Sequence, residues 1–104
     1  MPAKRTATDK LTRQKRLMLS PAEEKVINAL VTRIADELGT TVRLSHLLRA
    51  CLVIMQHAEP QILRRAASTQ MTRPPNEMAD VLGDFERRLA RLLLVSFKDS
   101  GKFQ

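Results

Sequence analysis

Cysteine and aromatic residues are scarce in this chain of 104 residues, which has one Cys, three Phe and neither Trp nor Tyr. The single cysteine, Cys51, excludes an intrachain disulfide and a zinc site built from several cysteines. The shortage of aromatic rings argues against binding nucleic acid by stacking bases on aromatic side chains. The longest unbroken run of apolar residues larger than alanine covers residues 51–55, far below the roughly 20 residues of a membrane span. No apolar segment of a secretory signal follows the first residues, so we expect a cytoplasmic protein with no membrane partner.

The usual ingredients of an active site are also missing. The three glycines, at positions 39, 83 and 101, form no phosphate-binding loop. His46 and His57 are eleven positions apart, about three helical turns, which is too far to share one metal ion. The acidic residues near the C-terminus recur at helical spacing and indicate a solvated helix face. We therefore expect no enzyme activity, no cofactor and no metal.

Positive charge is plentiful but unevenly distributed, and the net charge of the chain is +7. Six Lys and Arg against Asp9 alone give residues 1–20 a net charge of +5. Three Arg against Glu59 give residues 59–73 a net charge of +2, while residues 21–58 and 74–104 balance. Clustered Lys and Arg favour a polyanionic partner, because each phosphate that they neutralise releases counterions.

The N-terminal part of the chain changes character at residue 14. Residues 1–13 are polar, basic and without periodicity, and we interpret them as a flexible basic arm. In residues 14–19, Leu17 and Leu19 alternate with polar residues and Met18. This alternation with a period of two predicts a short β-strand.

An amphipathic helix is predicted over residues 21–38. Ser20 precedes Pro21, and Glu23 follows at the spacing of a capping box. Gly39 is expected to end the helix. The apolar residues of this segment have helical spacing; they are Val26, Ile27, Leu30, Val31, Ile34, Ala35 and Leu38.

The C-terminal half predicts further helices. Residues 46–58 are apolar nearly all round, so this helix needs cover from a second subunit, and Ser45 is its expected N-cap. Pro60 is expected to kink the chain within a linker at 59–75, where residues 62–67 add a short helical stretch. A last helix is predicted over 76–98, within a C-terminal segment of residues 76–104. One face of this helix forms a seam with coiled-coil spacing, comprising Met78, Leu82, Phe85, Leu89, Leu92 and Ser96.

A short basic strand, a capped helix and a very apolar helix together resemble the ribbon-helix-helix family of DNA-binding proteins, the MetJ/Arc type. The residues that carry this resemblance are 15–20, 21–39 and 42–50, within a segment of 14–58. The resemblance implies a mainly α protein with one short N-terminal β-strand. It also implies a dimer in which the strands of two subunits pair as an antiparallel ribbon. The C-terminal helix lies outside the family's pattern.

The resemblance also implies roles for individual residues. Those expected to contact base edges in the major groove are Gln14, Arg16 and Met18. Those expected to contact phosphates are Lys4, Arg5, Lys10, Arg13, Lys15, Arg43, Ser45 and His46. The expected dimer interface comprises Leu17, Leu19, Leu47, Leu48, Cys51, Leu52 and Met55.

The sequence thus predicts a homodimer that binds a specific double-stranded DNA site. Its biological role would be transcriptional repression, plasmid partition or accessory DNA binding in conjugation. The C-terminal helix would dock on its own dimer or build higher oligomers. The alternative is an antitoxin-like module whose residues 60–104 bind a partner protein. A third interpretation is an all-α dimer without a strand that binds nucleic acid non-specifically.

Overall fold

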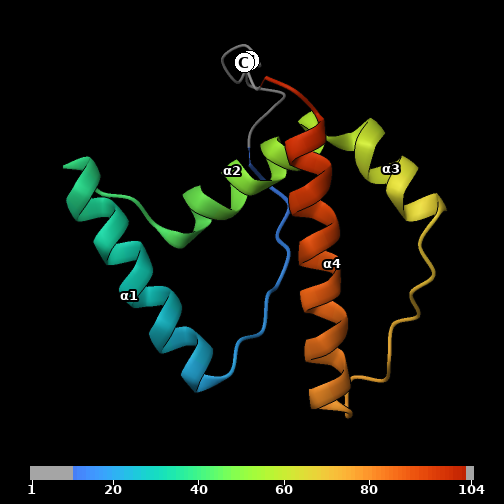
Figure 1. Ribbon diagram of the computed structural model, residues 1–104. Helices are drawn as coiled ribbons and strands as arrows, with labels where there is room; N and C mark the ends of the chain where they lie inside the picture. Colours follow the sequence, from blue (N-terminus) through green and yellow to red (C-terminus); the bar gives the residue numbers. More distant parts are fainter. Residues whose placement is uncertain (1–10, 103–104) are drawn as a thin grey trace. The chain divides into compact units, whose positions relative to one another are not determined.

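The computed structural model describes residues 11–102, which form four α-helices (Figure 1). Their bounds are Pro21–Leu38 for α1, Leu44–His57 for α2, Glu59–Ala67 for α3 and Ala79–Asp99 for α4. The chain divides into two compact units, the first ending at His46 and the second beginning at Leu47. We call residues 11–46 the N-terminal unit and residues 47–102 the C-terminal unit. None of the helices in residues 11–102 has the length and apolar character needed to cross a membrane.

The predicted β-strand at residues 14–19 is wrong, since residues 11–102 contain no strand and residues 11–20 have no regular secondary structure. The described fold is therefore all helical, which contradicts the expected ribbon-helix-helix architecture with its β-ribbon. The physical reason is that an alternating pattern of six residues does not hold a strand by itself. A strand needs a neighbour to accept and donate its backbone hydrogen bonds, and no other described segment supplies one.

Helix α1 begins and ends where the sequence predicts. Ser20 Oγ accepts a hydrogen bond from the Glu23 backbone N–H at 3.2 Å, and the Glu23 carboxylate accepts one from the Ser20 N–H at 2.9 Å. This reciprocal pair is the predicted capping box. At the other end Gly39 adopts a φ of 70°, a left-handed conformation that glycine adopts without steric cost. The N–H of Gly39 donates to the Ala35 carbonyl and closes the helix.

Helices α2 and α3 follow each other almost directly. Ala58 lies between them: its N–H donates to the Ile54 carbonyl and its own carbonyl accepts from the Ile62 N–H. Pro60 occupies the first turn of α3, where the missing N–H removes no helical hydrogen bond. The segment predicted as a kinked linker thus contains a nine-residue helix, which begins earlier than the predicted turn at 62–67.

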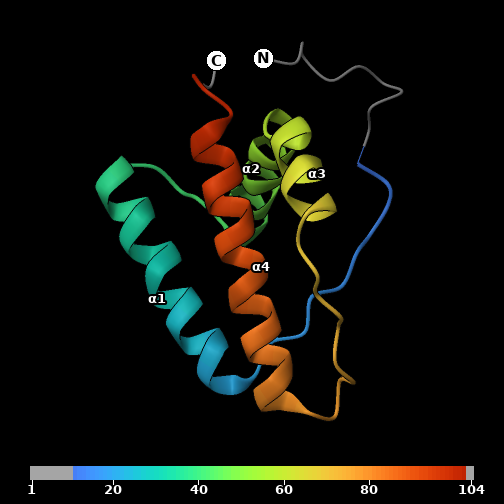
Figure 2. The same cartoon turned by 45° about the vertical axis from the view of Figure 1, so that its right-hand side comes forward.

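Helix α3 packs against α4 within the C-terminal unit (Figures 1 and 2). The side chain of Arg65 in α3 forms an ion pair with Asp99 at the end of α4. The rings of His57 and Phe97 meet edge to face, with centroids 6.1 Å apart and an interplanar angle of 65°. These contacts place the last two turns of α4 beside α3 and the end of α2.

Very little of the described chain is buried. Within residues 11–102 only Ala58 and Ser96 are buried, at 1% and 0% exposure. Ser96 belongs to the predicted coiled-coil-like seam of α4, and Leu92 of the same seam is half-buried. The C-terminal end of this seam is therefore used for packing inside the chain. Many apolar side chains elsewhere stay exposed.

Candidate nucleic-acid interface

The first candidate site is the basic segment, which we define as residues 11–20. It contains Arg13, Lys15 and Arg16 and no acidic residue, and all three side chains are exposed. The ion pairs among residues 11–102 involve other residues. The three charges are therefore unneutralised by any described carboxylate. An extended, exposed segment of this kind presents its charges to a polyanion without first breaking ion pairs.

The residues predicted to contact bases lie in the same basic segment. Gln14, Arg16 and Met18 are all exposed, and Met18 is 92% exposed. Leu17, predicted to point inward, is 61% exposed, whereas Leu19 is half-buried. Because no strand forms here, the described structure defines no two faces on which these residues alternate. Base contact by Gln14, Arg16 and Met18 stays a prediction.

The start of α2 differs in detail from its predicted form. The helix begins at Leu44, so Ser45 lies inside the first turn and is not the N-cap. Instead, His46 Nδ1 accepts a hydrogen bond from the Arg43 backbone N–H at 3.0 Å. This contact reproduces one half of a capping box with an imidazole in place of a carboxylate. The spacing of three residues between Arg43 and His46 is the spacing of a capping box, so the sequence did contain this signal. Histidine, however, is not a usual residue at the third position of a capping box.

The predicted phosphate contacts are thus only partly brought together. Arg13 and Lys15 share the basic segment, and Arg43, Ser45 and His46 lie at the start of α2. The remaining ones, Lys4, Arg5 and Lys10, lie outside the described residues, as does most of the predicted arm. Their contribution to binding stays a prediction.

The predicted dimer interface on α2 lies exposed. Leu48, Leu52 and Met55 are 40%, 55% and 42% exposed. Cys51 is also exposed, and Leu47 is half-buried. These residues leave an apolar helix surface that is partly open to solvent, although Leu52 and Met55 line one cavity together with α3. Exposed apolar surfaces mark contact sites in folded proteins.

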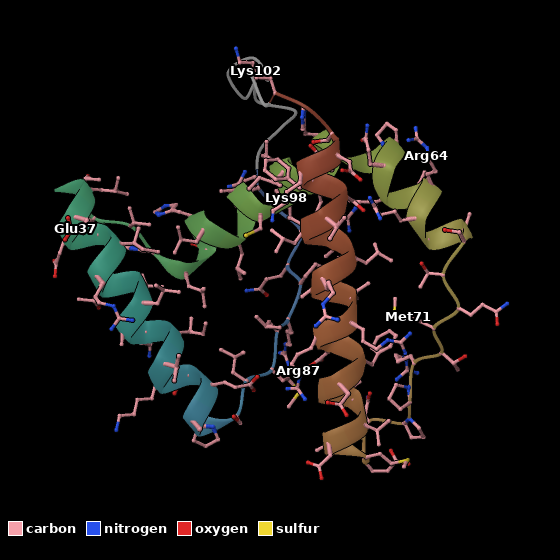
Figure 3. All side chains as sticks on the ribbon, in the orientation of Figure 1. Glu37, Arg64, Met71, Arg87, Lys98 and Lys102 are labelled. Atoms are coloured by element: carbon pink, nitrogen blue, oxygen red, sulfur yellow. The ribbon has the colours of Figure 1, made fainter. Side chains whose placement is uncertain are left out.

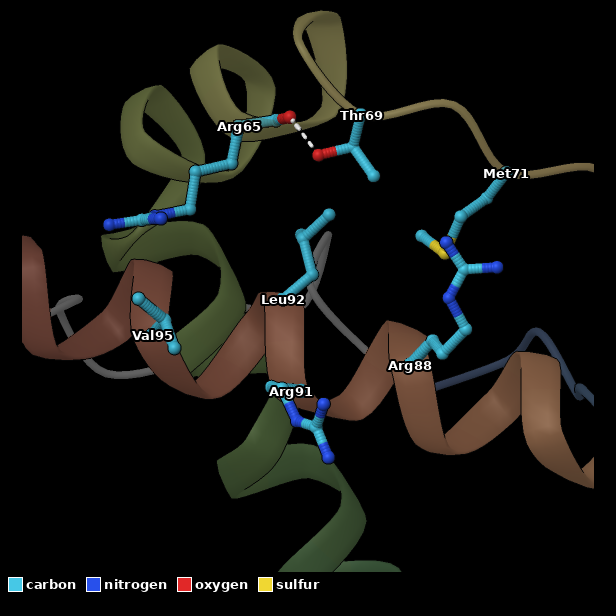
Figure 4. A pocket seen from close by; sticks show the side chains of 7 residues that line it. All are labelled: Arg65, Thr69, Met71, Arg88, Arg91, Leu92 and Val95. Carbon is cyan, nitrogen blue, oxygen red and sulfur yellow. Dashed lines mark hydrogen bonds between the residues drawn. The ribbon is translucent and has the colours of Figure 1, made fainter.

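A second cationic feature, which the sequence analysis missed, lies between α3 and α4. A cavity of about 250 Å³ is lined by Arg65, Thr69 and Met71 from α3 and the segment that follows it, and by four residues of α4 (Figure 4). Those four are Arg88, Arg91, Leu92 and Val95. They are spaced as one face of a helix, which was the signal that the sequence offered. The sequence did not indicate that α3 and the segment after it form the other side of the cavity.

We also searched the described residues for metal-binding clusters and compared the chain with known proteins. No group of three or more His, Cys, Asp or Glu side chains there is arranged to hold a metal ion. Comparison with protein-family models, with curated proteins and with solved structures finds no match to this chain. The resemblance to the ribbon-helix-helix family therefore has no support from relatives, and its β-ribbon is absent from residues 11–102.

Proposed function

We propose that the protein binds double-stranded DNA as a homodimer, through contacts between its basic segment and backbone phosphates. The observation that carries this proposal is the set of three exposed cations at positions 13, 15 and 16 with no carboxylate partner among the described residues. The overall charge of +7 adds long-range attraction to DNA. Phosphate contacts of this kind are independent of base sequence.

The dimeric state rests on a different observation. The apolar residues of α2 are exposed in the single chain, and burying them against a second copy would remove apolar surface from water. Apart from its two histidines, α2 contains one ionisable basic residue, Arg49. Two copies of a strongly basic chain can meet at such a surface with little charge repulsion. A DNA-binding dimer of this kind would act in the cytoplasm.

The test is a titration of labelled duplex DNA with the full chain at several salt concentrations. The variant Arg13→Ala/Lys15→Ala/Arg16→Ala should weaken binding, because it removes the three cations of the basic segment. The slope of log K against log salt should fall by about 0.9 for each phosphate that the variant no longer neutralises. The matched control is Lys25→Ala/Arg33→Ala/Arg87→Ala, which removes the same charge from α1 and α4.

The outcomes are distinct. Weaker binding confined to the first variant supports phosphate binding by the basic segment. Equal weakening in both variants would mean that only net charge matters, and absence of duplex binding by the unchanged chain would reject the proposal. Selection of duplexes from a random pool then separates sequence-specific binding from binding to any duplex. Recovery of one sequence would indicate base contacts by Gln14, Arg16 or Met18.

A second candidate function is the antitoxin-like binding of a partner protein by residues 60–104. It is supported by apolar side chains that α4 leaves exposed, among them Val81 and Leu94 at 45% and 56% exposure. The state of the free protein discriminates between the candidates. If Val81→Asp/Leu94→Asp converts a tetramer into a dimer, these side chains of α4 serve self-assembly; if the size does not change, they are left for a different protein.

A further inference from the structure

The cavity between α3 and α4 combines an apolar floor with a cationic edge. Leu92 projects from α4 toward Thr69, and Val95 and Met71 lie on either side of it (Figure 4). The guanidinium group of Arg88 extends from α4 toward Met71 (Figure 4). The lining includes three arginines and no acidic residue. The cavity therefore holds an excess of positive charge beside carbon atoms.

Only one of the three arginines is neutralised by a described carboxylate. The guanidinium of Arg65 is bound to Asp99, and its place in the last turn of α3 also complements the helix dipole. Among the described residues, no carboxylate forms an ion pair with Arg88 or Arg91. Asp84, one turn before Arg88, is bound by Arg87 instead. Arg88 and Arg91 are therefore without a described carboxylate partner. Their guanidinium groups point to different sides of α4, and that of Arg88 is the one that lies beside Met71 (Figure 4).

We propose that this cavity binds a phosphate group, held by Arg88 and Arg91. A guanidinium donates two parallel hydrogen bonds to phosphate oxygens, which makes arginine well suited to this anion. The two side chains leave α4 three positions apart, and rotation of the Arg91 side chain would bring its guanidinium to the cavity beside that of Arg88. Leu92 and Val95 would contact the carbon atoms next to the phosphate. At about 250 Å³ the cavity is smaller than pockets for drug-sized ligands, which suits one phosphate with a short adjoining part.

The phosphate could come from the DNA backbone or from a small phosphorylated compound. The site itself does not depend on the proposed function, because it lies in the C-terminal unit and uses none of residues 11–20. If the source is DNA, the cavity adds a second set of phosphate contacts to those of the basic segment. Both sources present the same phosphate group to the cavity. They are distinguished by whether duplex DNA competes with inorganic phosphate for the site.

The experiment follows the backbone amide resonances of the isotope-labelled full chain during titration with inorganic phosphate at constant ionic strength. Saturable shifts are expected at Thr69, Met71 and Leu92. The variant Arg88→Gln/Arg91→Gln should weaken binding at least about tenfold, because it removes both charge-assisted contacts. The control Arg87→Gln/Lys98→Gln removes equal charge from α4 outside the cavity (Figure 3) and should retain the affinity of the unchanged chain.

Absence of saturable shifts at these amides, or equal weakening in both variants, would overturn the proposal. Short duplex DNA then identifies the source. If the duplex displaces phosphate and itself binds Arg88→Gln/Arg91→Gln more weakly, the cavity takes a DNA phosphate. If phosphate stays bound in the presence of duplex, the site takes a small phosphorylated compound. The variant of the basic segment serves as a separate control, since its weaker DNA binding should leave the phosphate shifts unchanged.

Discussion

The guanidinium of Arg65 in α3 binds the carboxylate of Asp99 at the end of α4, although the two residues are 34 positions apart in the chain. Both side chains are partly exposed, at 42% and 49%. Residues 68–78 connect α3 to α4. The ion pair links these two helices, which line the cavity. The pair also removes Arg65 from the set of arginines that are free to bind an anion.

The first prediction concerns the strength of this ion pair. A double-mutant cycle with Arg65→Gln and Asp99→Asn should give a coupling free energy of about 0.2–1 kcal/mol, since partly exposed pairs are screened by solvent. The coupling should fall with added salt. The measurement is urea unfolding of the four proteins. The intrahelical pair of Asp84 and Arg87, which is more exposed, should give less; zero coupling for Arg65 and Asp99 at low salt would contradict the role assigned to it.

The second prediction concerns Ser96, which is fully buried and whose hydroxyl donates to the Leu92 carbonyl at 2.7 Å. Ser96→Leu should destabilise the protein by about 1–3 kcal/mol, because added methylenes do not fit a filled site. Ser96→Ala should change the stability little, since the Leu92 carbonyl keeps its backbone partner and Ala favours the helix. Thermal unfolding compares the variants. Equal stability of the Leu variant and the unchanged chain would mean that α4 does not pack through Ser96.

The third prediction contrasts two glycines. Gly39→Ala should cost about 1–2 kcal/mol, because its φ of 70° is left-handed and an added Cβ is strained there. Gly83→Ala should stabilise the protein by about 0.5–1 kcal/mol, because Gly83 lies inside α4 and glycine weakens helix interiors. A Cβ at Gly83 would meet only the Arg87 side chain, at an ordinary 3.8 Å. Urea midpoints that move in the same direction for both variants would disprove the contrast.

The fourth prediction concerns the apolar surface of α2. If the protein forms the proposed dimer, Leu48→Glu should shift it toward monomer, because dimerisation would bury an unpaired charge. Its helical content should be retained, since Leu48 is already 40% exposed in the single chain. Sedimentation velocity and circular dichroism measure the two properties. Leu38→Glu is the control at an exposed leucine outside the predicted interface; a fully dimeric Leu48→Glu protein would remove α2 from the dimer contact.

The interpretation of residues 14–19 as a strand shows where a sequence pattern is too short to decide structure. Six residues with alternating polarity fit an extended strand, but the same residues also fit an irregular basic segment. A helix satisfies its own backbone hydrogen bonds, and for this reason α1 could be predicted from its own residues alone. A strand depends on a neighbour that the sequence does not identify. The residues of the predicted dimer interface have the same limit, because a second copy that would cover them is another molecule.

Local signals in the amino-acid sequence were sufficient for α1, for the approximate extent of α2 and α4, and for the distribution of charge. Capping residues, glycine at a helix end and apolar periodicity act over a few neighbouring positions, so they are readable without a fold. The pairing of Arg65 with Asp99, the burial of Ser96 and the arginine-lined cavity required tertiary structure. Each depends on how α3 and α4 pack after the chain reverses, and packing brings together residues that no local rule connects.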